Sequence, residues 1–243
     1  MKNLKIIAEI GSNWSGSEKI GKKMIKAAKI TGADFIKFQM WRAEDLYSKS
    51  EPYWNLTKKS EITCKVAKQF KEYADKIGIG CFWSVFYPEA VDCLEDLNVK
   101  YYKIASWTAA MGHIHALETM QRVAKTGKPV IISMGMGGDI KVIKKIFKNN
   151  KKYFLYCISK YPTSVKEVDF LAISKYDGFS DHTMGHLAPL LYAMKVKDSD
   201  SVKFLEKHVS IKESKGQDKP NSIDMNEFSE MVKEIRTVTS LKI

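Results

Sequence analysis

The stretch "TGADFIKFQM", residues 31–40, shows in ten residues the alternation that decides the fold. Gly32 stands where an amphipathic segment stops, and the apolar run Phe35–Met40 that follows has the length and composition of a buried strand. "TGKP" repeats the same stop at Gly127, directly before another apolar run. Such runs recur roughly every 25 to 40 residues, separated by longer amphipathic segments. This spacing predicts a series of βα units.

Eight strands are expected, each followed by a helix. The predicted strands are Lys5–Gly11, Phe35–Met40, Ile79–Phe86, Tyr101–Ser106, Pro129–Gly135, Tyr153–Ser159, Gly178–Asp181 and Val202–Val209. The predicted helices are Ser17–Thr31, Lys58–Ile77, Pro88–Leu97, His113–Thr126, Ile140–Asn149, Val165–Ser174, His186–Met194 and Asn226–Leu241. Eight parallel strands with intervening helices close into a (β/α)8 TIM barrel of about 250 residues. Residues 1–243 are therefore expected to form one α/β domain; an open doubly wound sheet is the alternative, but its GxGxxG and Walker loops are absent from the sequence.

Composition narrows the classes of function. The formal net charge is +12, yet the only arginines are Arg42, Arg122 and Arg236, and the lysines are scattered. A nucleic-acid module would show clustered arginines with interleaved aromatics. The charge fits a lysine-rich surface or a small anionic ligand better than it fits nucleic acid. No apolar stretch approaches the ~20 residues of a membrane span, so no membrane association is expected.

The cysteines indicate a reducing compartment. The chain has four cysteines, and no two of them form a C-x-x-C motif: Cys64, Cys81, Cys93 and Cys157. The apolar run Leu4–Ile10 is interrupted by Lys5 and Glu9, so it does not form a secretory signal. A soluble, cytoplasmic protein with reduced thiols is the expectation.

Polar side chains stand at the carboxyl end of every predicted strand, where a buried parallel strand should be apolar. They are Glu9, Lys37, Gln39, Ser84, Lys103, Ser106, Ser133, Ser159, Asp181, His182, Glu206 and His208. Each serine alone would be read as a turn or cap hydroxyl. In a barrel, however, these ends converge on one mouth, which is where active sites of this fold are built.

Lys37 and Lys103 lie within the apolar runs "DFIKFQ" and "YYKIAS". Burying an unpaired ammonium is costly, so each needs a partner. One hypothesis is a cationic pocket for a small dianion. The other is that the lysines point outward or pair with Glu9 and Glu206.

His182 and His208 end neighbouring strands, beside a carboxylate. Alone, "SDHT" at residues 180–183 would be an ordinary helix-capping segment. Two neighbouring imidazoles could hold a divalent metal such as Mn²⁺, Mg²⁺, Co²⁺ or Zn²⁺, although two histidines specify none of these. Three other histidines are interpreted as helix-start or surface residues: His113, His115 and His186.

Eight motifs, in order, carry a family resemblance: "IAEIGSN", "AAKITGADFIKFQ", "YYKIAS", "KPVIISMGM", "YCISKYPTS", "GFSDHTMG", "EKHVS" and "GQDKPNS". They resemble the barrel domain of the sialic acid (N-acetylneuraminate) and nonulosonic acid synthases over essentially the whole chain. The resemblance implies condensation of phosphoenolpyruvate with an N-acylated mannosamine or a related sugar, giving a nine-carbon 2-keto acid and phosphate.

The resemblance also implies residue roles. Positions that hold phosphoenolpyruvate are matched by Lys37, Ser84, Lys103, Ser106, Ser133, Ser159 and Ser180. His182 and His208 match ligands of a divalent metal, Mn²⁺ or Mg²⁺. Positions lining the sugar and the reaction centre are matched by Glu9, Gln39, Tyr161, Glu206 and Asp218. Addition of water at C2 needs a positioned carboxylate, for which we expect Glu9, with Glu206 as the alternative.

The chain departs from the family at Trp14, where a histidine is usual, and at Trp107-Thr108, where Glu and Asn are usual. These changes predict a more apolar sugar side. Typical members continue into a small antifreeze-like domain. Two kinds of partner are therefore expected: a second copy of this chain (a homodimer), or a separate polypeptide that carries such a domain. Two alternatives stay open: a catalytically weakened barrel that binds phosphoenolpyruvate or sugar as a partner subunit, and a synthase for a different aldose.

Overall fold

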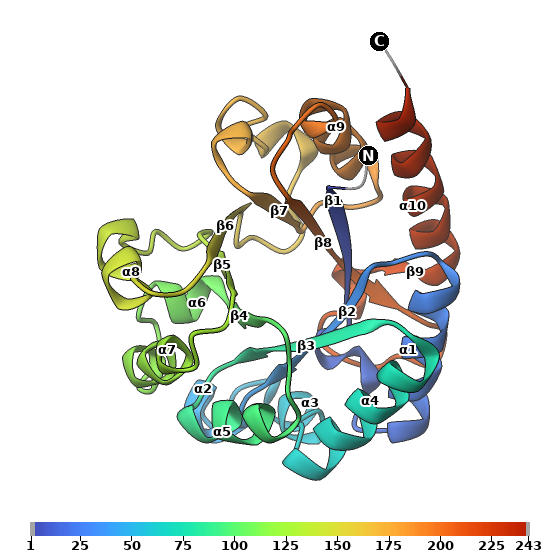
Figure 1. The fold of residues 1–243 in the computed structure, drawn as a ribbon. Coiled ribbons are helices and arrows are strands. Elements are labelled where there is room, and N and C mark those ends of the chain that lie inside the picture. Colours follow the sequence, from blue (N-terminus) through green and yellow to red (C-terminus); the bar gives the residue numbers. More distant parts are fainter. Residues whose placement is uncertain (1–2, 242–243) are drawn as a thin grey trace.

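A closed ring of parallel strands forms the centre of the molecule in the computed structural model, which describes residues 3–241 (Figure 1). Neighbours pair in chain order, and β1 pairs with β8 to close the ring. The strands of the ring are β1 (Leu4–Glu9), β2 (Phe35–Met40), β3 (Gly80–Val85), β4 (Tyr102–Ile104), β5 (Val130–Ser133), β6 (Lys152–Cys157), β7 (Gly178–Asp181) and β8 (Lys203–Ser210). The predicted (β/α)8 barrel is confirmed. A short strand, β9 (Ile223–Asp224), adds to β8 outside the ring.

Helices surround the barrel (Figure 1). They are α1 (Glu18–Ile30), α4 (Cys64–Ile77), α5 (Pro88–Asp96), α7 (Ala116–Lys125), α8 (Ile140–Ile146), α9 (Leu187–Val196) and α10 (Met225–Ser240). Ser17 caps α1 by accepting a hydrogen bond from the Ile20 amide. Gly78 ends α4 in the left-handed region, at φ 74°, where a residue without Cβ is favoured.

The predicted helix Lys58–Ile77 is two helices, α3 (Trp54–Lys59) and α4. Thr63 lies between them and caps α4 by accepting from the Val66 amide. A threonine at this place favours a helix start over an unbroken helix, because its hydroxyl satisfies a free N–H group.

The predicted helix Val165–Ser174 is also wrong. Two short 3₁₀ helices, η2 (Val165–Glu167) and η3 (Ala172–Lys175), replace it. Asp169, between them, accepts from the amides of Leu171 and Ala172 at 2.9 Å each, and this local bond competes with a continuous helix. Four further short elements were not predicted: η1 (Gly11–Trp14), α2 (Ala43–Leu46), α6 (Ser106–Ala109) and η4 (Lys219–Asn221).

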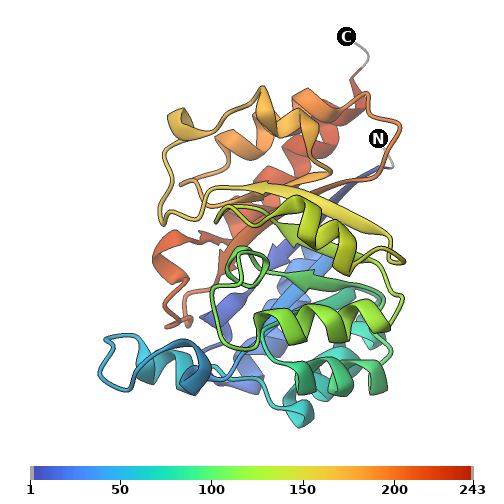
Figure 2. The ribbon, with the colours of Figure 1, turned by 90° about the vertical axis from the view of Figure 1, so that its left-hand side faces the viewer.

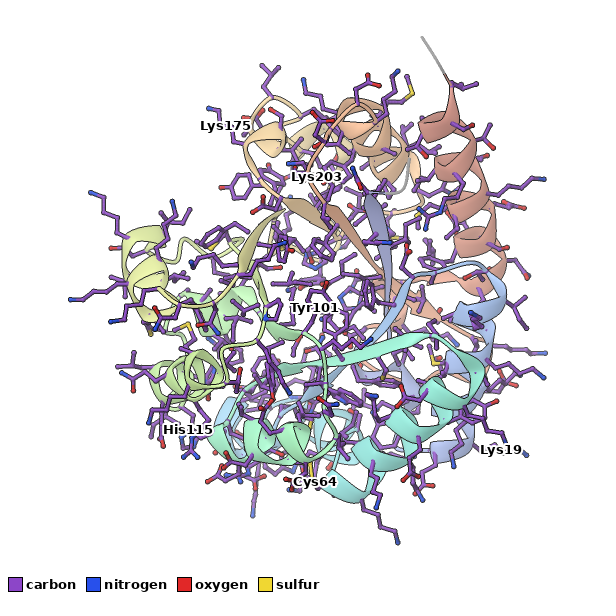
Figure 3. The ribbon with its side chains drawn as sticks, viewed as in Figure 1. Lys19, Cys64, Tyr101, His115, Lys175 and Lys203 are labelled. Carbon is purple, nitrogen blue, oxygen red and sulfur yellow. A yellow bond between two sulfur atoms is a disulfide. The ribbon has the colours of Figure 1, made fainter. Side chains whose placement is uncertain are left out.

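The barrel interior has an apolar floor beneath its polar mouth. Tyr101 lies inside the ring of strands (Figure 3) and packs against Phe82 and Phe204. The other buried members of this cluster are Ile7, Ile131, Tyr153 and Leu155. Because side chains alternate along a strand, the residues two positions beyond the floor face the mouth. That is how Ile7, Phe82 and Phe204 set the direction of Glu9, Ser84 and Glu206.

The expectation of four reduced thiols is wrong. Cys64, at the start of α4, and Cys93, in α5, form a disulfide with Cα atoms 5.8 Å apart (Figure 3), whereas Cys81 and Cys157 are free and buried. Spacing along the chain could not reveal this pair, since the two residues are 29 positions apart. Within residues 3–241, no helix is both long and apolar enough to cross a membrane.

Candidate active site

The carboxyl ends of the strands open into a cavity of about 810 Å³. Of the polar residues expected at this mouth, all but Glu9 and Asp181 line the cavity, and Asp181 instead pairs with Lys207 behind the barrel wall. Two loops, residues 41–63 and 211–222, project beyond the barrel on the left of Figure 2 and supply the outer wall. The convergence inferred from the sequence is therefore present in the structure.

Lys37 is buried and fully partnered. Its Nζ donates to Ser84 Oγ at 2.8 Å, and lies 2.5 Å from Glu9 Oε2 and 3.6 Å from Glu206 Oε2. Glu9 in turn accepts a hydrogen bond from Gln39 Nε2 at 2.8 Å. The ammonium thus sits between two carboxylates while its residue still lines the cavity.

Lys103 repeats this arrangement on the next strands. Its Nζ donates to Ser133 Oγ at 2.7 Å and lies 3.8 Å from Glu206 Oε1. The same Glu206 oxygen accepts from Ser180 Oγ at 2.8 Å. The pairing alternative considered from the sequence is therefore confirmed, and Glu206 is the carboxylate that faces both lysines.

The two carboxylates differ in their electrostatics. Burial would raise the pKa of Glu206, but the nearby Lys103 and Lys37 ammonium groups hold it at about 2. Burial raises the pKa of Glu9, and its contact with Lys37 offsets this only in part. Glu206 is therefore a fixed negative charge in the cavity wall at neutral pH, whereas Glu9 lies behind Lys37 and Gln39.

His182 is held in one tautomer. Its Nδ1 lies 2.7 Å from the Ile158 carbonyl, which can only accept, so Nδ1 carries the proton and, in the neutral ring, Nε2 presents a lone pair. Burial lowers the pKa of His182, but Cys157 and the bond to the Ile158 carbonyl raise it overall. Tyr161 OH lies 3.1 Å from that Nε2, and the two rings lie 4.2 Å apart. An Nδ1–H bonded to a carbonyl is the usual support of a metal-binding imidazole.

His208 faces the same part of the cavity, with its ring 5.6 Å from that of His182. Its buried Nδ1 has no hydrogen-bond partner among residues 3–241. Burial lowers the pKa of His208 to about 4, so the ring is neutral at physiological pH. An unpartnered, neutral imidazole nitrogen suits a metal or a substrate hydroxyl.

These two imidazoles fit a divalent metal only in part. In the described chain no group of three or more His, Cys, Asp or Glu side chains could enclose one. Any further ligands would be oxygens of substrate or water, which Mn²⁺ and Mg²⁺ accept readily. The other three histidines do not line the cavity: His113, His115 and His186.

The serines do surround the cavity, but two of them lie beyond the strands predicted to hold them, because five strands end one or two residues earlier than predicted: β1, β3, β4, β5 and β6. Ser106 is the first residue of α6, and its Oγ accepts from the Gly135 amide at 3.0 Å. Ser159 follows β6 by two residues. A Cβ at Gly135 would lie 2.6 Å from Ser159 Oγ, so glycine lets the two loops approach.

Asp218 reaches the site from the 211–222 loop. Its Oδ2 accepts from the Ser12 amide at 2.7 Å and from Ser12 Oγ at 2.6 Å. Gly11, at φ 52°, has no room for a Cβ, which would lie 2.4 Å from the same oxygen. Ser12 was not predicted, although it lies within the "EIGSN" motif.

Trp14 and Thr108 do not make the sugar side apolar. Trp14 is buried, donates from Nε1 to the Ser60 carbonyl at 3.2 Å, and packs edge-on against Phe70. Thr108 is buried, 2.9 Å from His113 Nε2. Neither lines the cavity. The expectation was wrong for these two residues, because a change at a loop position can be absorbed by packing behind the wall.

The outer wall is nevertheless largely apolar, and sequence reasoning missed most of it. Trp107 lines it beside side chains from the two loops and their neighbours: Trp41, Leu46, Tyr47, Tyr53, Leu56, Phe86, Met136, Pro162 and Pro220. The available signal was the concentration of aromatic residues in the segment after β2, which has no helical or strand period.

Comparison with known proteins identifies the family. The NeuB family matches residues 24–242. An uncharacterised protein of Methanocaldococcus jannaschii is 40% identical over 97% of this chain and 71% of its own length. Pseudaminic acid synthase of Campylobacter jejuni is 33% identical over 98% of this chain and 75% of its own. N-acetylneuraminate-9-phosphate synthase of Homo sapiens is 31% identical over 96% of this chain and 69% of its own length.

A solved structure supports the same family assignment. N-acetylneuraminic acid (sialic acid) synthetase from Leptospira borgpetersenii superposes with a TM-score of 0.85 at 28% identity, covering 96% of this chain and 83% of that one. The chain therefore belongs to the NeuB family and is an N-acetylneuraminate synthase-like transferase.

Proposed function

We propose that this chain condenses phosphoenolpyruvate with the open-chain aldehyde of an N-acylated amino sugar, assisted by a divalent metal. The observation that carries this proposal is the pair of buried lysines, each hydrogen-bonded to a serine and both facing one carboxylate. Two ammonium groups at the bottom of one cavity suit a small molecule that bears both a carboxylate and a phosphate.

In the proposed reaction, C3 of phosphoenolpyruvate attacks the aldehyde carbon and forms the new C–C bond. Water then adds at C2, and the C–O bond to phosphate breaks, so the products are a nonulosonic acid and inorganic phosphate. Lys37 and Lys103 hold the two anionic groups of phosphoenolpyruvate, together with the hydroxyls of Ser84 and Ser133. Fixed cations cost no reorganisation as charge moves toward the leaving phosphate.

Glu206 is the carboxylate placed to orient the water, since it lines the cavity and is ionised. Glu9 does not line the cavity, and in this proposal it acts by positioning Lys37 and Gln39. Ser106, Ser159 and Ser180 supply further hydroxyls around the anions. Tyr161 and Asp218 stand on the acceptor side.

His182 and His208 would hold the metal, through nitrogen atoms that carry no proton. A bound Mn²⁺ or Mg²⁺ supplies Lewis-acid polarisation of the acceptor aldehyde. Tyr161, 3.1 Å from His182 Nε2, would have to give way to it. A homodimer or a separate domain that completes the site stays a prediction.

The experiment is phosphate release from phosphoenolpyruvate with Mn²⁺ or Mg²⁺, in the presence and absence of 2-acetamido and 2,4-diacetamido hexoses. The proposal requires release that depends on an acceptor, is abolished by a chelator, and is lost in Lys103→Met. Tight phosphoenolpyruvate binding without turnover on any acceptor favours a phosphoenolpyruvate-binding partner subunit instead.

A further inference from the structure

The structure points to the class of acceptor, an inference that rests on the proposed function. We propose that the acceptor carries no phosphate and bears apolar substituents, as a 2,4-diacetamido-2,4,6-trideoxyhexose does, and that hexosamine 6-phosphates are rejected. Sequence similarity does not decide between acceptors with and without phosphate. The relative named for a phosphorylated product is 31% identical to this chain, and a relative named for a product without phosphate is 33% identical.

The first argument is the charge of the cavity. Among the described residues that line it, Lys37 and Lys103 are the only lysines, and no arginine lines it. Both lysines face Glu206, and the wall also carries Asp218. Phosphoenolpyruvate would use both cations. A second phosphate would therefore find no further lysine or arginine in the cavity wall and would lie next to two carboxylates.

The second argument is that three lysines near the rim have partners outside the cavity. Lys58 Nζ lies 2.9 Å from carboxylate oxygens of both Glu44 and Glu61. Lys219, next to lining residues of the 211–222 loop, donates to the Lys212 carbonyl at 3.0 Å. Lys160, next to Tyr161, pairs with Glu167 at 2.6 Å. These exposed pairs are weak, but they direct the ammonium groups away from the cavity.

The third argument is the apolar outer wall. Trp107 of α6 and Tyr47 of the 41–63 loop lie beside the cavity, with their rings 6.2 Å apart. Tyr53 and Met136 also line it while being 54% and 51% exposed. Apolar side chains left open at a cavity mouth mark a surface that a ligand covers. Methyl groups of acetamido substituents and of a deoxy carbon would bury against them.

The wall also carries amide groups that suit acetamido substituents. Gln217 and Asn221 line the cavity from the 211–222 loop. Thr57 Oγ1 donates to Gln217 Oε1 at 3.3 Å, so the two loops meet at this side chain. Carboxamides both donate and accept hydrogen bonds, as the acyl amide of the acceptor requires.

The test compares kcat/KM for N-acetylmannosamine, its 6-phosphate and a 2,4-diacetamido-2,4,6-trideoxyhexose. The diacetamido sugar should be used at least roughly tenfold better than N-acetylmannosamine, since apolar groups in a pocket discriminate by about that factor. The 6-phosphate should be used least. Best use of the 6-phosphate, or equal use of N-acetylmannosamine, overturns the inference and leaves the proposed function standing.

Turnover of none of the three contradicts the proposed function instead. In that case, calorimetric affinities of the same sugars for the phosphoenolpyruvate-loaded protein still rank them, and a preference for the 6-phosphate overturns the inference. A gain-of-charge variant adds a second readout. Met136→Lys should raise kcat/KM or affinity for the 6-phosphate about tenfold, whereas Leu171→Lys, exposed and off the cavity, should leave it unchanged. No gain in Met136→Lys counts against the inference.

Discussion

Lys207 Nζ lies 2.6 Å from Asp181 Oδ2, and both side chains are completely buried. The two residues are opposite one another on β7 and β8, and each directly precedes a cavity histidine, His182 or His208. Because side chains alternate along a strand, this ion pair lies on the far side of the barrel wall from the cavity. Lys207 also donates to the Thr183 carbonyl. The ion pair therefore holds together the ends of β7 and β8, which carry the two histidines.

Lys207→Met should lower the free energy of unfolding by about 3 to 5 kcal/mol, since it leaves the Asp181 carboxylate buried without its cation. Urea denaturation measures this. Lys68→Met breaks an exposed pair with Glu72 and should cost less than about 1 kcal/mol. Removing both partners in Lys207→Met, Asp181→Asn should cost less than the two single changes added together. If the costs of the two single changes add up to that of the double change, the two side chains do not stabilise one another and the account of the pair is wrong.

Much of the barrel could be predicted because the signal was local and repeated. Glycine stops, apolar strands and polar strand ends such as Lys37 and His182 are all visible in short stretches. The disulfide and the burial of Trp14 could not be predicted, since both depend on which segments far apart in sequence become neighbours. The depth of Glu9 could not be predicted, because strand alternation gives the face of a side chain but not its depth in the barrel.

The Cys64–Cys93 disulfide should stabilise the chain by about 3 to 4 kcal/mol, because it closes a long loop in the unfolded state. Cys64→Ser is the suitable change, since Cys64 is exposed and its replacement leaves no cavity. Urea denaturation with and without reductant gives the result: reductant should lower the stability of the parent to that of Cys64→Ser and leave the variant unchanged. Four reactive thiols in the denatured, unreduced parent would contradict the bond.

Glu206→Gln and Glu9→Gln should separate the two carboxylates. Glu206→Gln removes the charge that lines the cavity and should lower kcat about 100-fold or more. Glu9→Gln acts through Lys37, so it should mainly raise the KM for phosphoenolpyruvate and lower kcat less. Steady-state kinetics, with metal binding measured in parallel, decides between them. A larger loss of kcat in Glu9→Gln with unchanged KM would make Glu9 the group that handles the water.

His208 should make the metal-free protein less stable in mild acid. Its pKa is about 4 in the folded protein and about 6.5 when unfolded, so its contribution is fully present above the unfolded value and is lost as pH falls through the folded value. The loss should reach on the order of 3 kcal/mol between pH 7 and pH 4. Urea denaturation in chelator measures it, with His208→Asn as the reference. An identical pH dependence in that variant would contradict the assignment.

The most direct test of the proposed condensation is the fate of oxygen in ¹⁸O-labelled water. The protein, phosphoenolpyruvate, Mn²⁺ and a 2-acetamido or 2,4-diacetamido hexose are incubated in this water, and phosphate and sugar products are analysed by mass spectrometry. Attack of water at C2 predicts unlabelled phosphate together with one new nine-carbon 2-keto acid per phosphate. Labelled phosphate with free pyruvate would show simple hydrolysis at phosphorus and would contradict the account.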